Sequence, residues 1–429
     1  MLNSHFETTE NMKKYVPLAP VNKDEKIKNS GIYMCCDEEN IYIDSKFNNN
    51  LVIGESGSGK TQAVTLPLLK TSLLATESVI VTDLNKDLYN FTHEEFEKNG
   101  YNTLVFNFDN SRSGDSFNPF ALITKLYKNK DYDLAQEAIE NLGFSLIREK
   151  TDNIGDPFWE NSAINFFSGL VLYALENDID LSFDAIQEIE NEIVEDNEKF
   201  INSLDKKNPS YINLVGILSA PNETRGSIIS VFNQKIKSFF SKTDLKNMLS
   251  DTNFDYDSLF NSKTIIYLVP GMTTVSERLI SLIISQFTFA KRVFNDSCKY
   301  NIILDNFNNM NYIKNIVNIV NNSKHFGMKF TIIVSGFNEI ENIYGKEQTN
   351  LLKACFNNIV YLLSSDIETL EEISKMCGNK EEDGKVSPLV SVSDLKTLKM
   401  FEAIILAQRV MPYKTELCPY YKLTENGIF

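Results

Sequence analysis

The sequence predicts an α/β protein with a mainly parallel sheet, into which an all-helical domain is inserted. The first observation is a glycine-rich loop at residues 54–61, between a short apolar strand and a helix. The second is that other apolar strands alternate with helices before residue 121 and after residue 263. This order builds a parallel sheet with right-handed crossovers. The third is a stretch, 122–213, with helical periodicity and almost no strand signal.

The glycine-rich loop has the composition of a phosphate-binding loop. It follows the apolar strand Leu51–Ile53 and fits the pattern GxxxxGK[ST]. Its glycines allow a tight turn whose N–H groups surround a phosphate. Lys60 would contact the β- and γ-phosphates, and the Thr61 hydroxyl would bind Mg²⁺. We therefore predict nucleotide binding, by the residues Gly54, Glu55, Ser56, Gly57, Ser58, Gly59, Lys60 and Thr61.

Composition narrows the class of protein. The length of 429 residues indicates two or three domains, and a hydrophobic content of 42% is ample for a core. A net charge of −16 argues against a surface that coats duplex DNA, although it leaves room for a local basic groove. Six scattered cysteines and three unclustered histidines argue for reduced thiols and against a zinc or haem site. We expect no signal peptide and no membrane span, because the longest apolar stretch, 166–175, is too short.

The order of the segments predicts a divided nucleotide-binding domain. We expect an N-terminal arm at 1–30, the first part of the domain at 31–121, the helical insert at 122–213 and the second part at 214–429. We expect the arm to be loosely held and to lead into an antiparallel hairpin. Ligands of parallel sheets bind at the carboxyl ends of the strands, where the loop after Ile53 and the carboxylate of Asp83 would both lie.

A second acidic residue follows a later strand. Residues 301–304 are apolar and end in Asp305, the arrangement expected for a carboxylate that holds Mg²⁺ through water. An apolar strand ending in Asp is common, so this signal is weak by itself. Further strands are expected at 264–269, 330–334, 358–363 and 403–407.

Three features have two interpretations each. An aromatic and aliphatic stripe at 158–174 is either core or a platform for stacking bases, and core is favoured. The acidic run 188–198 is either a solvated helix face or a docking surface. The basic run with Lys235, Lys242 and Lys246 is either a solvated face or a surface that follows a phosphate backbone.

An ordered set of short motifs resembles the TraG/TraD-like coupling ATPases of conjugation and type IV secretion, which are RecA-like P-loop NTPases. The resemblance runs from Gly31 to Tyr421. Each motif is weak alone, and their order makes them specific. They are 54–61 with Leu66-Pro67, Val81-Thr82-Asp83, Gly100-Tyr101, Phe106-Asn107, Phe117-Asn118-Pro119, Asp156-Pro157-Phe158-Trp159, Ile303-Leu304-Asp305, Tyr344-Gly345 and 409–421 with Pro412.

The resemblance implies ATP and Mg²⁺ as cofactors and a motor domain joined to a helical domain that faces the transferred substrate. It implies hexameric rings with ATP sites between neighbours. It also implies that DNA, or a relaxase or effector protein, is passed to the proteins of a secretion channel. Many members have paired N-terminal membrane helices, which are missing here. We therefore expect a cytoplasmic protein that reaches the inner face of the membrane through partners.

The sequence departs from the family at the residues of hydrolysis. Asn306 stands where the family has the Glu that polarises water, and an amide cannot act as a base. Ser335 replaces a glutamine at the end of the next strand. Lys324 replaces the arginine that completes a neighbour's site, and lysine cannot make a two-pronged contact with the γ-phosphate. We expect Asp305, Asn306, Lys324 and Ser335 to occupy the catalytic positions.

Three functions fit these residues. The first is a coupling ATPase that still hydrolyses ATP, using Asp87 or Glu339 in place of the lost glutamate. The second is a nucleotide-binding scaffold that recruits substrates without turnover. The third, a metabolic P-loop kinase, is disfavoured because the sequence shows neither a lid nor an acceptor motif.

Overall fold

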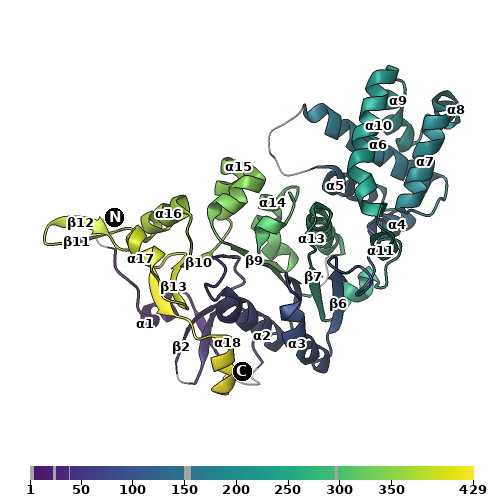
Figure 1. Ribbon diagram of the computed structural model, residues 1–429. Coiled ribbons are helices and arrows are strands. Elements are labelled where there is room, and N and C mark those ends of the chain that lie inside the picture. Colours follow the sequence, from purple (N-terminus) through teal and green to yellow (C-terminus); the bar gives the residue numbers. More distant parts are fainter. Residues whose placement is uncertain (1–3, 23–25, 38, 149–155, 295–297) are drawn as a thin grey trace.

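The computed structural model describes residues 4–22, 26–37, 39–148, 156–294 and 298–429 (Figure 1). Within these ranges the largest sheet has nine strands in the order β14-β13-β10-β4-β9-β8-β5-β7-β6. Neighbours from β10 to β6 are parallel, whereas β13 and β14 are antiparallel additions at one edge. The prediction of a mainly parallel sheet is confirmed. The strands are β4 (Asn50–Gly54), β5 (Ser78–Thr82), β6 (Asn102–Asn107), β7 (Thr264–Val269), β8 (Tyr300–Leu304), β9 (Met328–Val334), β10 (Asn358–Leu363), β13 (Glu402–Ala407) and β14 (Tyr413–Glu416).

The central strands are apolar because both faces of the sheet are covered. In β4, Leu51 and Ile53 pack into one apolar cluster and Val52 into the other, as the alternation of a strand requires. Helices α2 (Leu66–Leu74), α3 (Asp87–Lys98) and α18 (Tyr420–Glu425) cover one face. The other face is covered by α13 (Thr274–Phe294), α14 (Ile316–Asn322), α15 (Phe337–Lys353), α16 (Ile367–Cys377) and α17 (Val392–Lys396).

Helices replace strands between β6 and β7. In Figure 1 most of them form a cluster at the upper right, built around the long helix α6. Strand structure resumes only at Thr264, after α12. The helices are α4 (Ala121–Lys128), α5 (Tyr132–Ile147), α6 (Pro157–Glu176), α7 (Phe183–Glu195), α8 (Asn197–Ser203), α9 (Pro209–Leu218), α10 (Asn222–Phe240), α11 (Thr243–Met248) and α12 (Tyr256–Asn261).

The N-terminal segment is more ordered than expected. It forms helix α1 (Thr9–Tyr15) and strand β1 (Leu18–Val21), and β1 joins the expected hairpin of β2 (Tyr33–Cys36) and β3 (Ile41–Asp44). The prediction of a loosely held arm was wrong for residues 9–21, because Met12, Val16 and Val21 are buried in a shared apolar cluster. A separate hairpin, β11 (Asn379–Glu382) and β12 (Lys385–Pro388), follows α16.

A membrane-spanning helix was not expected. Across the described ranges, the structure contains no helix that is both long enough and apolar enough to cross a bilayer.

Candidate nucleotide site

The glycine-rich loop leaves the carboxyl end of β4, a strand that lies between β10 and β9 in the middle of the sheet. Gly57 and Gly59 have φ of 81° and 87°, in the left-handed region that glycine enters without strain. A Cβ on Gly59 would also lie 2.6 Å from Cε1 of Phe401, so the ring of Phe401 packs against the loop. The hydroxyl of Ser58 is buried without a partner among the described residues. The loop is therefore compact and carries an unused polar atom.

The loop continues into a helix that begins with an irregular turn. Residues Thr61–Thr65 form a π-helical turn, η1, which leads into α2. Turns of this kind are rare and are often found at functional sites. The side chain of Gln62 accepts a hydrogen bond from the backbone N–H of Tyr421, 3.3 Å away, and this bond ties the turn to α18. Thr61 thus stands at the start of the helix, directly after the loop.

Asp305 lies close to Lys60, although the two are far apart in the sequence. Strand β9 is inserted between β4 and β8, and the three parallel strands end at one edge of the sheet. Burial raises the pKa of Asp305 above its ordinary value, and the positive charge of Lys60 partly offsets this rise. The backbone N–H of Asp305 donates to Oγ1 of Thr82 at 2.7 Å, so β5 helps to position the turn. A buried carboxylate beside the loop lysine is the donor that a Mg²⁺-nucleotide site requires.

Asp83 lies at the same edge but has a structural role. Its carboxylate accepts hydrogen bonds from the N–H groups of Leu88 at 3.1 Å and Tyr89 at 2.8 Å, in the first turn of α3. Burial raises the pKa of Asp83. This carboxylate fixes the helix that follows β5.

Asn306 has φ 53° and ψ 56°, a left-handed conformation that asparagine tolerates better than most residues. Ser335 follows β9, and its backbone N–H donates to Oε2 of Glu339 at 2.8 Å. Its carbonyl oxygen accepts a hydrogen bond from the hydroxyl of Ser364 at 2.6 Å. The backbone of Ser335 is therefore held on both sides at the end of β9.

A cavity of about 660 Å³ lies beside the loop and is acidic. Glu55 and Glu339 both line it, and a carboxylate oxygen of Glu55 also accepts hydrogen bonds from the backbone and hydroxyl of Ser365. Asp87 is exposed at the start of α3 and does not line this cavity. Of the two carboxylates predicted to substitute for a missing glutamate, Glu339 lines this cavity and Asp87 does not. Sequence reasoning included Glu55 in the loop but missed its contact with Ser365, and it missed Phe401 altogether, because no local pattern marks either contact.

Lys324 lies at the opposite edge of the sheet. It belongs to the short 3-10 helix η3 (Ser323–Phe326), just before β9, and it is exposed. The seven residues of β9 separate it from Ser335 by about 20 Å at a rise near 3.3 Å per residue. Lys324 therefore cannot contact a nucleotide in the loop of its own chain.

Two of the three lysines of the basic run form internal ion pairs, whereas Lys242 is exposed. Lys235 lies 3.5 Å from Glu160, and Lys246 lies 2.8 Å from Asp184. Ile236 and Phe239 are buried in the core of the helical region. Most of the predicted stripe is core as well, since Phe167, Leu170, Val171 and Ala174 are fully buried, whereas Phe158 at its start is 47% exposed.

The family model of type IV secretory system conjugative DNA transfer proteins matches residues 7–423 of this chain. The chain belongs to this family. The match covers both the sheet with its phosphate loop and the helical region, so the family resemblance found in the motifs is confirmed.

Solved structures of other proteins have a similar fold. The plasmid coupling protein TrwB, in complex with ADP and Mg²⁺, aligns with a TM-score of 0.70 at 15% identity, over 97% of this chain and 94% of that chain. TrwB with a non-hydrolysable ATP analogue aligns with a TM-score of 0.68 at 16% identity, over the same shares. VirB4 of Thermoanaerobacter pseudethanolicus aligns with a TM-score of 0.55 at 11% identity, over 92% and 97%.

A curated relative matches only locally. An uncharacterized protein of Bacillus anthracis is 38% identical over 60 residues, which are 14% of this chain and 22% of that protein. The match thus spans about a fifth of the curated relative's length.

Proposed function

We propose that this family member binds Mg²⁺-ATP at residues 54–61 and couples the nucleotide state to the transfer of DNA through a conjugative secretion system. The juxtaposition of Lys60 and Asp305 at neighbouring strand ends carries this proposal. Family membership supplies the role in DNA transfer, and TrwB structures contain ADP with Mg²⁺ and an ATP analogue. We assign nucleotide binding to the parts of the chain that form the sheet and the substrate-facing role to the helices α4 to α12, which continue past the boundary at 213 expected from the sequence because α9 runs through it.

The residues present suit a magnesium ion. The Thr61 hydroxyl and the Asp305 carboxylate are hard oxygen donors, and the left-handed turns at Gly57 and Gly59 keep the loop compact. A bound Mg²⁺ would neutralise charge on the β- and γ-phosphates. Lys60 would hold those phosphates, and the backbone N–H groups of the loop would surround them.

Hydrolysis, in this proposal, is slow and depends on Glu339. Asn306 cannot accept a proton from water, whereas Glu339 faces the cavity beside Glu55 with one carboxylate oxygen held by Ser335. Its second oxygen is available to orient a water. The alternative function is a scaffold that binds nucleotide without turnover, and the departure at Asn306 favours it.

The proposal includes assembly into a ring. Lys324 lies at the edge of the sheet opposite to its own loop, so its charge can serve only the site of another copy. A hexamer with ATP between neighbours, by resemblance to the family, satisfies this geometry. The ring would act on the cytoplasmic side of the membrane with channel proteins and a relaxase or effector as partners.

Substitution of the loop lysine tests the proposal. Lys60→Ala removes the loop cation aimed at the phosphates and should weaken ATP binding at least about tenfold, measured by calorimetry with Mg²⁺. Lys70→Ala is the matched control, because Lys70 lies on the same helix segment and pairs with Glu95 away from the loop. Unchanged ATP affinity of Lys60→Ala would refute the proposed site.

A further inference from the structure

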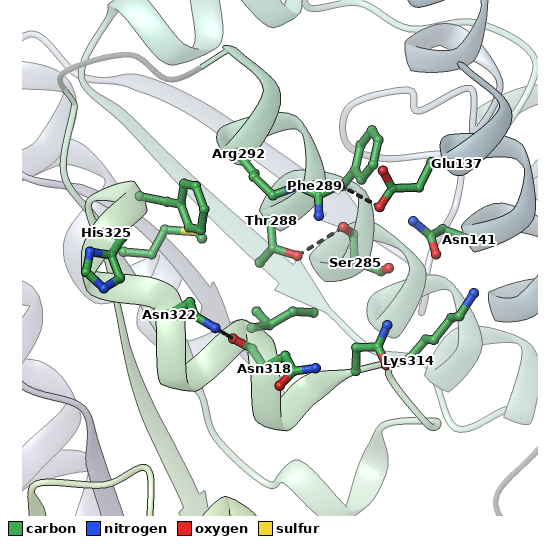
Figure 2. Close-up of a pocket in the computed structure, with 14 residues that line it drawn as sticks. Glu137, Asn141, Ser285, Thr288, Phe289, Arg292, Lys314, Asn318, Asn322 and His325 are labelled. Atoms are coloured by element: carbon green, nitrogen blue, oxygen red, sulfur yellow. Dashed lines mark hydrogen bonds and ion pairs between the residues drawn. The ribbon is translucent and has the colours of Figure 1, made fainter. Parts of the chain in front are cut away.

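A second cavity, of about 410 Å³, lies between the helical region and the sheet (Figure 2). Its walls come from α5, α13 and the segment from α14 to the start of β9. This segment leads into the amino end of β9. The cavity wall that it forms therefore lies toward the amino ends of the strands, whereas the phosphate loop lies at their carboxyl ends. The volume falls within the range of roughly 300–1,000 Å³ that ligand pockets occupy.

Amide side chains dominate the rim of this cavity. Asn141, Asn318 and Asn322 point toward it from two sides in Figure 2. Within the described ranges, the side-chain amides of Asn141 and Asn318 have no hydrogen-bond partner. Each amide offers two donors and an acceptor with two lone pairs. The cavity therefore presents unused hydrogen-bonding groups of both kinds, which suit the edge of a nucleobase.

The floor of the cavity is buried and partly apolar. Phe289 is 7% exposed and Met328 is 3% exposed, and the polar residues Ser285 and Thr288 line the cavity with them. The guanidinium of Arg292 already lies over the Phe289 ring, 4.9 Å from its centroid, so the floor offers apolar contact and no free aromatic face. A purely ionic ligand would gain little from such a floor.

The charge of the cavity suits one phosphate. Arg292 and Glu137 form an ion pair of 2.6 Å and so neutralise each other. Lys314 lies 5.4 Å from the ring centroid of Phe144 and has no ion pair among the described residues. Lys314 is therefore a local positive charge beside neutral polar groups, in a chain whose net charge is −16.

We propose that this cavity binds one unstacked nucleotide of single-stranded DNA, with the edge of the base hydrogen-bonded by the asparagines and the phosphate near Lys314. The inference rests on the proposed role in DNA transfer and locates a binding site for the transferred strand. A duplex would not present an unstacked base to this pocket, and a highly acidic peptide would meet too few free cations.

Filling the cavity tests the inference. Asn318→Trp should weaken binding of a fluorescein-labelled oligothymidylate about tenfold or more, measured by anisotropy, because the indole occupies the space of a base. Asn321→Trp is the matched control: it lies on the same helix α14 and is exposed, but it does not line the cavity. Both variants should bind ATP with wild-type affinity, which shows that they are folded.

A second variant tests the phosphate contact. Lys314→Gln should make the slope of log affinity against log salt shallower by about 0.7, the value for one lost contact to a single strand. An oligothymidylate with abasic sites should bind the wild type more weakly but should bind Asn318→Trp as the intact strand does.

Each outcome separates this inference from the proposed function. If the wild type binds the strand and Asn318→Trp binds it equally well, the cavity is not the site, while the role in DNA transfer stands. If Asn318→Trp changes only the oligomeric state, the cavity is a contact between copies and the inference is wrong. If the wild type binds ATP but no single strand, even when oligomeric, both the inference and the DNA-coupling role are overturned.

Discussion

Gly59 shows how one residue meets two independent requirements. Its φ of 87° favours glycine on backbone grounds, and the ring of Phe401 fills the place of a side chain. Phe401 itself has φ 71°, a strained conformation for a bulky residue. Strain of this kind persists only where the surroundings impose it. Here the hydrogen bond from the N–H of Leu417 to the Phe401 carbonyl helps to hold the ring against the loop.

The carboxylate of Glu339 should control ATP turnover. Glu339→Gln keeps an oxygen that can accept from the N–H of Ser335 but removes the base, so the hydrolysis rate should fall by roughly 10²–10⁴-fold at unchanged ATP affinity. The hydrolysis rate is measured as steady-state phosphate release. Asp87→Asn is the control, since Asp87 is exposed outside the cavity. Equal rates for Glu339→Gln and wild type would exclude Glu339 as the base.

Restoring the family's glutamate should raise the rate at a cost in stability. Asn306→Glu supplies a carboxylate next to Asp305, but its left-handed backbone disfavours glutamate by about 1–2 kcal/mol. We expect faster phosphate release together with a lower melting temperature. A variant as slow as the wild type, although folded and able to bind ATP, would show that the missing glutamate does not limit turnover.

At the scale of the elements, the position of β9 determines the site. It separates β4 from β8, so that Lys60, Ser335 and Asp305 follow three adjacent strands. The amino ends of these strands are held by a buried polar network. Lys329 on β9 lies 2.9 Å from Glu77, and Asn301 on β8 donates to the same carboxylate at 2.6 Å. Ser30 also donates to Glu77 and connects the N-terminal segment to the sheet.

Breaking this buried ion pair should destabilise the sheet. Glu77→Leu leaves the Lys329 ammonium, 3% exposed, without its partner and should cost about 3–5 kcal/mol of the free energy of unfolding, measured by urea denaturation. Glu77→Leu with Lys329→Met should recover much of that loss, because no buried charge remains. If Glu77→Leu alone were as stable as the wild type, the ion pair would not be buried in solution.

The same ion pair of Glu77 and Lys329 predicts that the stability of the fold depends on pH. Burial lowers the pKa of Lys329 below its ordinary value of 10.5, despite the opposing charge of Glu77. The unfolded chain therefore binds this proton more tightly, and the contribution of Lys329 to stability should rise as the pH rises toward 10.5. Lys329→Met should flatten the alkaline part of the stability curve.

At the scale of the whole molecule, the two edges of the sheet have different roles. The carboxyl edge carries the loop and its acidic cavity, and the amino edge carries Lys324. A complete site would then need residues from two copies, which a closed ring of head-to-tail contacts provides.

Mixing an impaired variant with an inactive one tests whether a site needs residues from two copies. Lys324→Ala should lower ATP hydrolysis on the order of tenfold or more without weakening ATP binding, because the cation acts on a neighbour's nucleotide. Lys60→Ala should be inactive through loss of binding. Mixed oligomers of the two should regain part of the activity, since some interfaces combine an intact loop with an intact Lys324. If verified mixed oligomers regain no activity, Lys324 does not act on the nucleotide of a neighbouring copy.

The sequence alone determined the phosphate loop, the apolar strands, the parallel character of the sheet and the family. These follow from local patterns: glycines at fixed spacing, strand runs that end in Asp305, and helices between strands. It also predicts that Asn306 stands at the family's glutamate position, which stays a prediction. Tertiary structure decided which residues meet. Phe401 reaches Gly59, Glu339 lies beside Glu55, Lys324 faces away from its own loop, and Lys235 and Lys246 pair with carboxylates. Such contacts depend on strand order and long-range packing, which no local pattern encodes.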